Sequence, residues 1–307
     1  MYPQGELPEL PPEVRTQALP ASRHGWQRLR YEQVTLPRAA AKLGADLLLI
    51  LAEGIPLAAD LPIVAVPPIE PASSSAGVLA SLRRAAGRAG ARGASARLCP
   101  ADVLSSEGNA EAYPPFVSDG FHHQEGKSPD AVQEYVLCYD TDPENVRKAL
   151  AAWTWVDGAL GDTYPLLFLG CDSDTERQIL AVAAELNVVD SVTIRSKVSE
   201  LPRIYHRAAA FLSVGLAAGG QPFRWALAAE VPVAAFETRP ASSIMGEAAY
   251  LVPQGDTRAL GAACLSLLVQ EELADSLRAK GRKRAQAYRG GPPIQQLIEI
   301  LKRTAAK

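Results

Sequence analysis

The first part of the chain alternates between helical and extended apolar patterns. Apolar side chains recur near helical spacing over residues 31–43, which predicts a short helix. Unbroken apolar runs of strand length follow at 45–51 and 61–66. A second helix is predicted over 76–89 and a short strand over 96–99. Strands that are apolar throughout are typical of a parallel sheet covered on both faces.

From residue 135 onward the alternation becomes regular. Strands are predicted at 135–139, 166–169, 191–194, 210–214, 231–236 and 248–252, and helices at 145–156, 175–186, 199–209, 222–229, 257–268, 271–288 and 294–302. Strands that alternate with helices of this length form βαβ units with right-handed crossovers. The pattern therefore predicts an α/β fold with parallel sheets.

A polar stretch rich in Gly, His and Ser separates the two halves. We therefore predict an N-terminal α/β domain over 1–118, a linker over 119–131, a C-terminal α/β domain over 132–290 and a C-terminal helix over 291–307. Residues 1–25 contain five prolines and few periodic apolar positions, so an extended lead-in is expected there.

The balance of charge argues against nucleic acid as a partner. The chain has 31 basic and 34 acidic residues, a net charge of −3, and so no overall basic character. One local cluster of arginines, at 83, 84, 88, 92 and 97, is interleaved with Ala and Gly and is interpreted as the solvated face of a helix.

Cysteine usage and the N-terminus point to the cytoplasm. The four cysteines form no C-x-x-C pair, which argues for a reducing compartment and against a disulfide framework or a zinc site. The N-terminus is acidic and Pro-rich, unlike a signal peptide. No apolar stretch approaches the roughly 18–20 residues that span a bilayer. A cytoplasmic protein is predicted, and a peripheral contact with a membrane stays open.

The candidate ligand site lies in loops after the strands, because ligands of open parallel sheets bind outside the carboxyl ends. Gly219 and Gly220 precede a predicted helix, where backbone N–H groups and the helix dipole favour a phosphate. Arg224 would add donors suited to a diphosphate, and Arg195 and Lys197 follow another strand. The alternative is that the two glycines only make the turn and that Arg224 points into solvent.

No metal site and no catalytic residue is predicted. The two D-x-D patterns, Asp140–Asp142 and Asp172–Asp174, could hold a divalent cation, but Asp142 and Asp174 immediately precede predicted helices and are interpreted as caps. His122 and His123 lie in the polar stretch without carboxylates at a spacing typical of a metal site, and His206 is expected to be exposed. The chain has no Walker loop, no G-x-G-x-x-G after a strand and no G-x-S-x-G, so kinase, NAD and hydrolase functions are unsupported.

Several segments nevertheless resemble one family in order and spacing. These are Arg30-Tyr-Glu-Gln-Val-Thr-Leu-Pro-Arg, Gly44-Ala-Asp-Leu-Leu-Leu, Tyr113-Pro-Pro-Phe-Val, Val198-Ser-Glu-Leu-Pro-Arg-Ile-Tyr and Gly246-Glu-Ala-Ala-Tyr-Leu-Val-Pro. Over roughly residues 28–290 the chain resembles retaining GT-B glycosyltransferases of the glycogen-synthase-like group 1. The resemblance implies two Rossmann-like domains with parallel sheets, the first truncated, and a nucleotide-diphosphate sugar as donor substrate rather than a bound cofactor.

The chain departs from this family where the donor would bind. The resemblance implies two glutamates around the Gly-rich turn, and their positions are occupied by Ala217 and Trp225. A lysine position is filled by Glu144, between Asp142 and the following helix, with Asp140 nearby. Like charges at 4 Å repel by about 1 kcal/mol in water and several times more in a pocket, so acids are unfavourable for a diphosphate.

Two hypotheses follow from the match and the departures. The first is a glycosyltransferase that uses a nucleotide sugar and a glycan acceptor, with a retuned donor site. The second is a pseudoenzyme, a catalytically silent GT-B scaffold or partner subunit in polysaccharide or glycan assembly, with Trp225 filling the donor groove.

Overall fold

The computed structural model describes residues 25–51, 54–66, 78–103, 110–122, 134–140, 142–196, 198 and 200–306. The described residues divide into two compact units. The larger unit contains Phe116–Gly290, and the smaller contains the segments up to Pro115 together with those from Gly291 onward. The chain therefore leaves the smaller unit after Pro115 and returns to it at Gly291.

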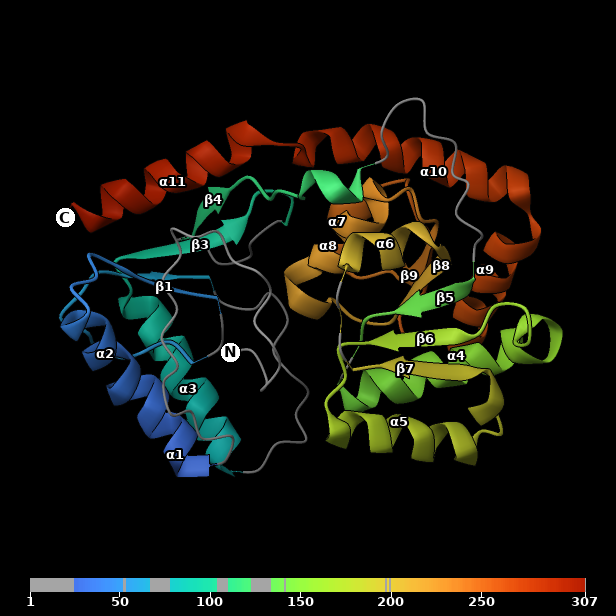
Figure 1. Ribbon diagram of the computed structural model, residues 1–307, viewed down its shortest axis with the longest axis horizontal. Helices are drawn as coiled ribbons and strands as arrows, with labels where there is room; N and C mark the ends of the chain where they lie inside the picture. Colours follow the sequence, from blue (N-terminus) through green and yellow to red (C-terminus); the bar gives the residue numbers. More distant parts are fainter. Residues whose placement is uncertain are drawn as a thin grey trace. The chain divides into compact units, whose positions relative to one another are not determined.

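The smaller unit is built on a four-stranded parallel sheet in the order β1-β2-β3-β4 (Figure 1). Its elements are α1 (Gly25–Arg30), a π-helical turn (Tyr31–Thr35), α2 (Leu36–Lys42), β1 (Leu48–Ile50), β2 (Ile63–Ala65), α3 (Val78–Gly93), β3 (Ala96–Pro100), β4 (Glu111–Tyr113) and α11 (Gly291–Ala305). The three strands expected from the apolar runs are present, and β4 is a strand that the sequence patterns did not predict.

Each face of this sheet packs against different helices. On one face, side chains of β1 and β2 such as Leu48, Ile50 and Ile63 pack with α2 and α3. On the other face, Val64 and Leu98 pack against Ile300 of α11. The last helix of the chain thus completes a core with strand residues that lie more than 200 positions earlier. Arg303 of this helix also forms an ion pair with Glu111 of β4.

The Glu32-Gln33 pair holds the loop that follows β1. The Glu32 carboxylate is buried and accepts hydrogen bonds from Arg83 Nε, at 3.0 and 2.9 Å to its two oxygens, and from Arg28 Nε at 3.1 Å. Gln33 Nε2 donates to the carbonyl of Ile55 (3.1 Å), and Gln33 Oε1 accepts from the amide of Leu57 (2.9 Å). Two side chains from one helical turn therefore fix the β1–β2 connection.

The larger unit contains a six-stranded parallel sheet in the order β10-β9-β8-β5-β6-β7. Its strands are β5 (Tyr135–Cys138), β6 (Leu166–Leu169), β7 (Val192–Arg195), β8 (Ala208–Ser213), β9 (Val233–Phe236) and β10 (Tyr250–Val252). Its helices are α4 (Pro143–Leu160), α5 (Ser173–Glu185), α6 (Leu201–His206), α7 (Gln221–Ala228), α8 (Arg239–Met245), α9 (Thr257–Val269) and α10 (Glu271–Ala285), with 3₁₀ turns at Asp119–Phe121, Val189–Ser191, Ala217–Gly220 and Gln286–Tyr288. The predicted α/β fold with parallel sheets is confirmed.

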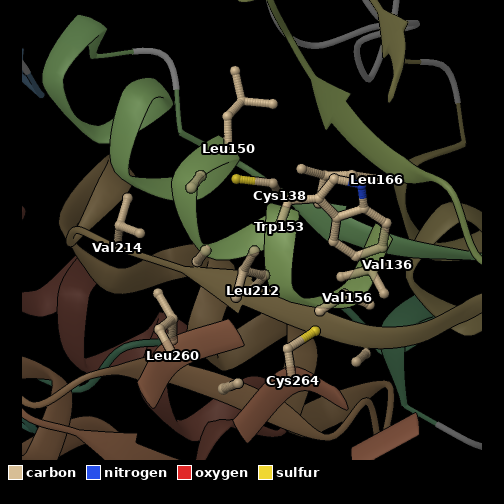
Figure 2. Close-up of a cluster of buried hydrophobic side chains, with 14 of the residues drawn as sticks. Val136, Cys138, Leu150, Trp153, Val156, Leu166, Leu212, Val214, Leu260 and Cys264 are labelled. Carbon is tan, nitrogen blue, oxygen red and sulfur yellow. The ribbon is translucent and has the colours of Figure 1, made fainter. Parts of the chain in front are cut away.

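The main core of this unit lies between the sheet and helices α4, α5 and α9. Figure 2 shows Trp153 of α4 among Val136, Cys138 and Leu166, with Leu212 and Leu260 beside them. Trp153 also donates its indole N–H to Ser191 Oγ at 2.9 Å, so its polar atom is satisfied inside the core. Because side chains alternate along a strand, Phe211 of β8 points to the other face, where it contacts Tyr205 and Phe223 of α6 and α7.

Two predicted elements need correction, and a third prediction lies almost wholly outside the described residues. The helix predicted over 199–209 ends at His206, and Ala208 and Ala209 belong to β8. Burial in a central strand overrides the helix propensity of alanine at these positions. Helix α8 lies where a loop was expected. Thr238 caps this helix by accepting a hydrogen bond from the amide of Ala241 (3.2 Å). The predicted lead-in over residues 1–25 lies outside the described residues except for Gly25, which begins α1.

Candidate functional site

The larger sheet has its topological switch point between β5 and β8. From β5 the chain adds β6 and β7 on one side, and from β8 it adds β9 and β10 on the other. In open parallel sheets, ligands bind outside the carboxyl ends of the strands at this point. The residues that follow β5 and β8, Tyr139-Asp140 and Val214-Gly215, therefore define the candidate site.

A buried carboxylate occupies this point. Asp140 is 2% exposed, and its two oxygens accept hydrogen bonds from Asn145 Nδ2 (3.1 Å) and from the backbone amide of Val214 (3.3 Å). A Cβ atom on Gly215 would lie 3.3 Å from Asp140 Oδ1 and 2.4 Å from Asn145 Nδ2. Asp140 thus joins β5, β8 and the start of α4, and it places a carboxylate directly beside the loop after β8.

The Gly-rich turn is the second part of the site. Gly219 and Gly220 have φ angles of 66° and 79°, a region that glycine enters without steric cost. A Cβ atom on Gly220 would also lie 2.3 Å from Ile244 Cδ1 of α8. Both glycines are therefore required by the turn itself, and Gly220 closes the packing between α7 and α8.

Arg224 is directed into the protein and not into solvent. Its side chain is 1% exposed, and Nη1 donates to the carbonyl of Gly219 (3.0 Å) and to Gln221 Oε1 (3.4 Å). The guanidinium also lies 6.0 Å from the ring centre of Tyr288. The alternative in which Arg224 points into solvent is wrong, because the guanidinium is buried beneath the turn that the two glycines form.

The structure brings together only part of the predicted phosphate site. Gly219, Gly220 and Arg224 form one contiguous group. Arg195 is exposed at the end of β7, the edge strand that stands three strand spacings from β8, or roughly 14 Å. Lys197 lies outside the described residues. A role for these residues in holding a diphosphate stays a prediction.

One aspartate of each D-x-D pattern caps a helix. Asp142 accepts from the amide of Glu144 (3.0 Å) and caps α4 as expected. In the second pattern, Asp172 caps α5 by accepting from the amide of Thr175 (2.9 Å), while Asp174 lies in the first turn and pairs with Arg177. The helix begins two residues earlier than predicted, so the cap role moves from Asp174 to Asp172.

An aromatic cluster borders the switch point. Trp225 stacks on Phe121 with ring centres 5.4 Å apart and an interplanar angle of 3°. Tyr139 and Tyr205 each meet the Trp225 ring edge-on at 5.9 Å. The Tyr205 hydroxyl is buried and has no hydrogen-bond partner among the described residues, and burial, followed by the neighbouring Tyr139 and Cys138, raises its pKa well above the usual range.

Sequence reasoning singled out Trp225 but missed its neighbours. Phe121 lies in the polar stretch that was interpreted as a linker, and only its aromatic character within that stretch signals a packed position. His206 was expected to be exposed, but it is partly buried and one ring nitrogen lies 2.9 Å from the carbonyl of Gly120. The segment 119–122 is therefore held against α6 and α7 within the larger unit.

Comparison with solved structures places this geometry in a known fold. WaaG, a glycosyltransferase involved in lipopolysaccharide biosynthesis, superimposes with a TM-score of 0.71 at 15% identity over 96% of this chain and 88% of its own. Sucrose-phosphate synthase from Thermosynechococcus elongatus gives 0.67 at 18% identity over 96% and 84%, and Anabaena HepE in complex with UDP and glucose gives 0.67 at 13% over 87% and 81%. The chain has the GT-B glycosyltransferase fold.

The likeness is confined to the fold. No protein-family model and no curated protein sequence matches the chain. The structural neighbours share fewer than one residue in five with it, which fits the divergence predicted from the sequence. HepE was also crystallised with UDP-glucose, and the similar pneumococcal O-GlcNAc transferase GtfA was crystallised with UDP and GlcNAc.

The structure describes the surroundings of the positions at which the chain departs from the family that it resembles. Ala217 begins the 3₁₀ turn that contains Gly219 and Gly220, and Trp225 lies in α7 within the aromatic cluster. Glu144 pairs with Lys148 Nζ at 2.6 Å. Glu230, which has a φ of 56°, accepts two hydrogen bonds from Arg282, at 2.8 and 2.5 Å.

Within the described segments, no group of three or more His, Cys, Asp or Glu side chains is arranged to hold a metal ion. The helices of the described residues include none with the length and apolar character needed to cross a bilayer.

Proposed function

We propose that this chain is a GT-B protein of glycan assembly that does not transfer sugar from a nucleotide donor. The observation that carries this proposal is the buried carboxylate of Asp140 at the switch point of the larger sheet. It occupies the place where a GT-B donor site needs a positive environment for a diphosphate.

The electrostatics of the site disfavour a diphosphate. A negative charge 4 Å from a carboxylate is opposed by about 4 kcal/mol at an effective dielectric constant of 20. The amide of Val214, a donor that could otherwise face a phosphate, already donates to Asp140. Stabilising a leaving diphosphate requires positioned cations, and Arg224, the arginine predicted for this role, is buried beneath the Gly-rich turn.

The aromatic cluster supports the same proposal. The resemblance places a carboxylate that accepts ribose hydroxyl groups at position 225, where this chain has tryptophan. An indole ring has no acceptor and donates only through its N–H. Its stacking on Phe121 also fixes one ring face against the protein, so we propose that Trp225 fills the space in which a nucleoside would lie.

We further propose that the protein acts in the cytoplasm as a scaffold or partner subunit of a glycan-assembly system. All four cysteines are free thiols, and Cys138, Cys171 and Cys264 are buried. Burial raises the pKa of the Cys171 thiol to about 12, which keeps it protonated and unreactive. Unpaired buried thiols suit a reducing compartment.

One observation favours the second candidate, an active glycosyltransferase with a retuned donor site. The turn before α7 retains both glycines in left-handed conformation, and Arg195 is exposed at the carboxyl end of β7. An extended nucleotide sugar that avoided Asp140 could contact both regions. The two candidates differ in whether the chain binds a nucleotide.

Calorimetric titration of the full chain with UDP, GDP and UDP-glucose separates the candidates. We expect no binding at millimolar nucleotide, whereas HepE, which was crystallised with UDP, serves as the positive control. Micromolar binding, equivalent to about −8 kcal/mol, would contradict the proposal. In that case Arg195→Gln, a change at an exposed side chain, would report whether the ligand reaches β7.

A further inference from the structure

Helices α1, α2 and α3 of the smaller unit, with the π-helical turn, carry a strong excess of basic residues. They contain eight, Arg28, Arg30, Arg38, Lys42, Arg83, Arg84, Arg88 and Arg92, and a single acidic residue, Glu32. Glu32 is buried between Arg28 and Arg83 and pairs with both, so it offsets one of their two positive charges. The exposed arginines of α3 therefore stand on a helix surface with no acidic residue, although the whole chain has a net charge of −3.

The exposed face of α3 carries apolar side chains as well as basic ones. Val78, Leu82, Ala85 and Ala89 follow i, i+4, i+7 and i+11 spacing, and all four are exposed. Val78 is 79% and Leu82 46% exposed, so large apolar side chains lie on the outer surface. Arg88 and Arg92, which are also exposed, follow the adjacent line of the same helix. Outward stripes of apolar and basic side chains therefore run side by side along α3.

Helix α1 extends this surface. It packs against α3, and its Trp26 is 63% exposed. Figure 1 shows α1 and α3 side by side on the same face of the four-stranded sheet, while α11 covers the other face. Tryptophan, leucine and arginine together are the composition of helices that lie in the plane of a membrane surface. Arginine can keep its charge among the headgroups while its carbon chain lies along the apolar layer.

We propose that the outer face of α1 and α3 binds the surface of a membrane that contains anionic phospholipids. The exposed Trp26, Val78 and Leu82 would enter the boundary between headgroups and acyl chains, and Arg88 and Arg92 would contact the lipid phosphates. Nucleic acid offers the same phosphates but no apolar layer to cover the exposed side chains, so the lipid surface fits better. This proposal does not depend on whether the larger unit binds a nucleotide.

Flotation of the full chain with vesicles tests the proposal. We expect binding to vesicles of phosphatidylcholine mixed with phosphatidylglycerol, little binding to phosphatidylcholine alone, and release at high salt because ions screen the attraction. The double variant Arg88→Gln/Arg92→Gln should bind about thirtyfold more weakly, since each basic residue near an anionic surface contributes about one factor of five. Trp26→Ser should also weaken binding, without changing its dependence on salt.

The matched control is Lys283→Gln/Lys302→Gln. It removes the same charge from exposed positions on α10 and on α11, the latter on the opposite face of the four-stranded sheet, and it should leave vesicle binding unchanged. Equal losses in both double variants, or equal binding to both kinds of vesicle, would overturn the proposal. Arginine-dependent binding to a DNA duplex, with no binding to vesicles, would also overturn it and would assign the surface to nucleic acid.

Discussion

At the scale of single residues, Asp140 has two effects with opposite consequences. It stabilises the larger unit, because it satisfies Asn145 and the amide of Val214 where β5, β8 and α4 meet. It also keeps a negative charge at the switch point, where GT-B ligands would bind. A side chain that serves the fold in this way resists loss whether or not the chain binds a sugar donor.

The replacement Asp140→Asn should destabilise the protein by about 1–3 kcal/mol. An amide has only one oxygen acceptor, so its NH₂ group would face either the amide of Val214 or Asn145 Nδ2, both of which are donors. Urea unfolding at neutral pH measures the change. Asp142→Asn is the matched control, because asparagine also caps helices well and should have little effect. Equal stability of both variants would show that Asp140 makes no such contribution.

At the scale of elements, close helix contacts depend on glycines whose role the sequence does not reveal. Helix α3 contains Gly87, Gly90 and Gly93, which on propensity alone weaken a helix. A Cβ atom on Gly90 would lie 2.4 Å from the carbonyl oxygen of Pro56, whereas one on Gly93 would meet nothing within 4 Å. Gly90 therefore allows α3 to approach the loop that Gln33 holds in place.

Two identical substitutions in α3 should have opposite effects. Gly93→Ala should stabilise the smaller unit by about 0.5–1 kcal/mol through helix propensity. Gly90→Ala gains the same propensity but forces α3 away from a backbone oxygen, and overpacking of this kind costs about 1–3 kcal/mol. Thermal unfolding of the two variants beside the parent protein measures both signs. A stabilised Gly90→Ala protein would show that the contact with Pro56 is loose.

The elements that the sequence predicted were those with a strong periodic signal. The buried strands β5, β6 and β9 are apolar along their whole length, β8 is apolar except for Ser213, and the predicted cap at Asp142 precedes a regular helix. Strand β4 was missed because it has three residues, none of them fully buried. Helix α8 was missed although Thr238 and Pro240 signal its start, because seven residues show too little periodicity.

The candidate site was less predictable than the fold, because its contacts join distant parts of the chain. The position of the Gly-rich turn followed from local pattern alone. The burial of Arg224 and the stacking of Phe121 on Trp225 depend on tertiary packing between residues up to about a hundred positions apart. Local spacing contains no information on either contact.

At the scale of the whole molecule, the smaller unit is discontinuous in sequence. Its sheet comes from residues before Pro115, and α11, which buries Val64 and Leu98 on one face, comes after Gly290. Among the described residues, the larger unit is one continuous stretch with its own core. We therefore expect the larger unit to fold from a single segment of chain and the smaller unit to need two.

We expect a fragment of residues 116–290 to fold cooperatively by circular dichroism and urea unfolding. A fragment of residues 1–115 should be poorly folded and prone to aggregate, because the sheet face around Val64 and Leu98 would meet water. Joining residues 291–307 to that fragment through a flexible Gly/Ser linker should restore a soluble, folded unit. A monomeric and folded 1–115 fragment would contradict the assignment of α11 to this core.

The return of α11 has a consequence for how the protein is made. The strands of the smaller unit leave the ribosome first, but their covering helix is translated only after the whole larger unit. At bacterial or eukaryotic rates of about 5–20 residues per second, that interval is on the order of ten seconds or longer. During it, one apolar face of the nascent sheet is uncovered while the next domain already folds, so this protein should engage chaperones early in translation.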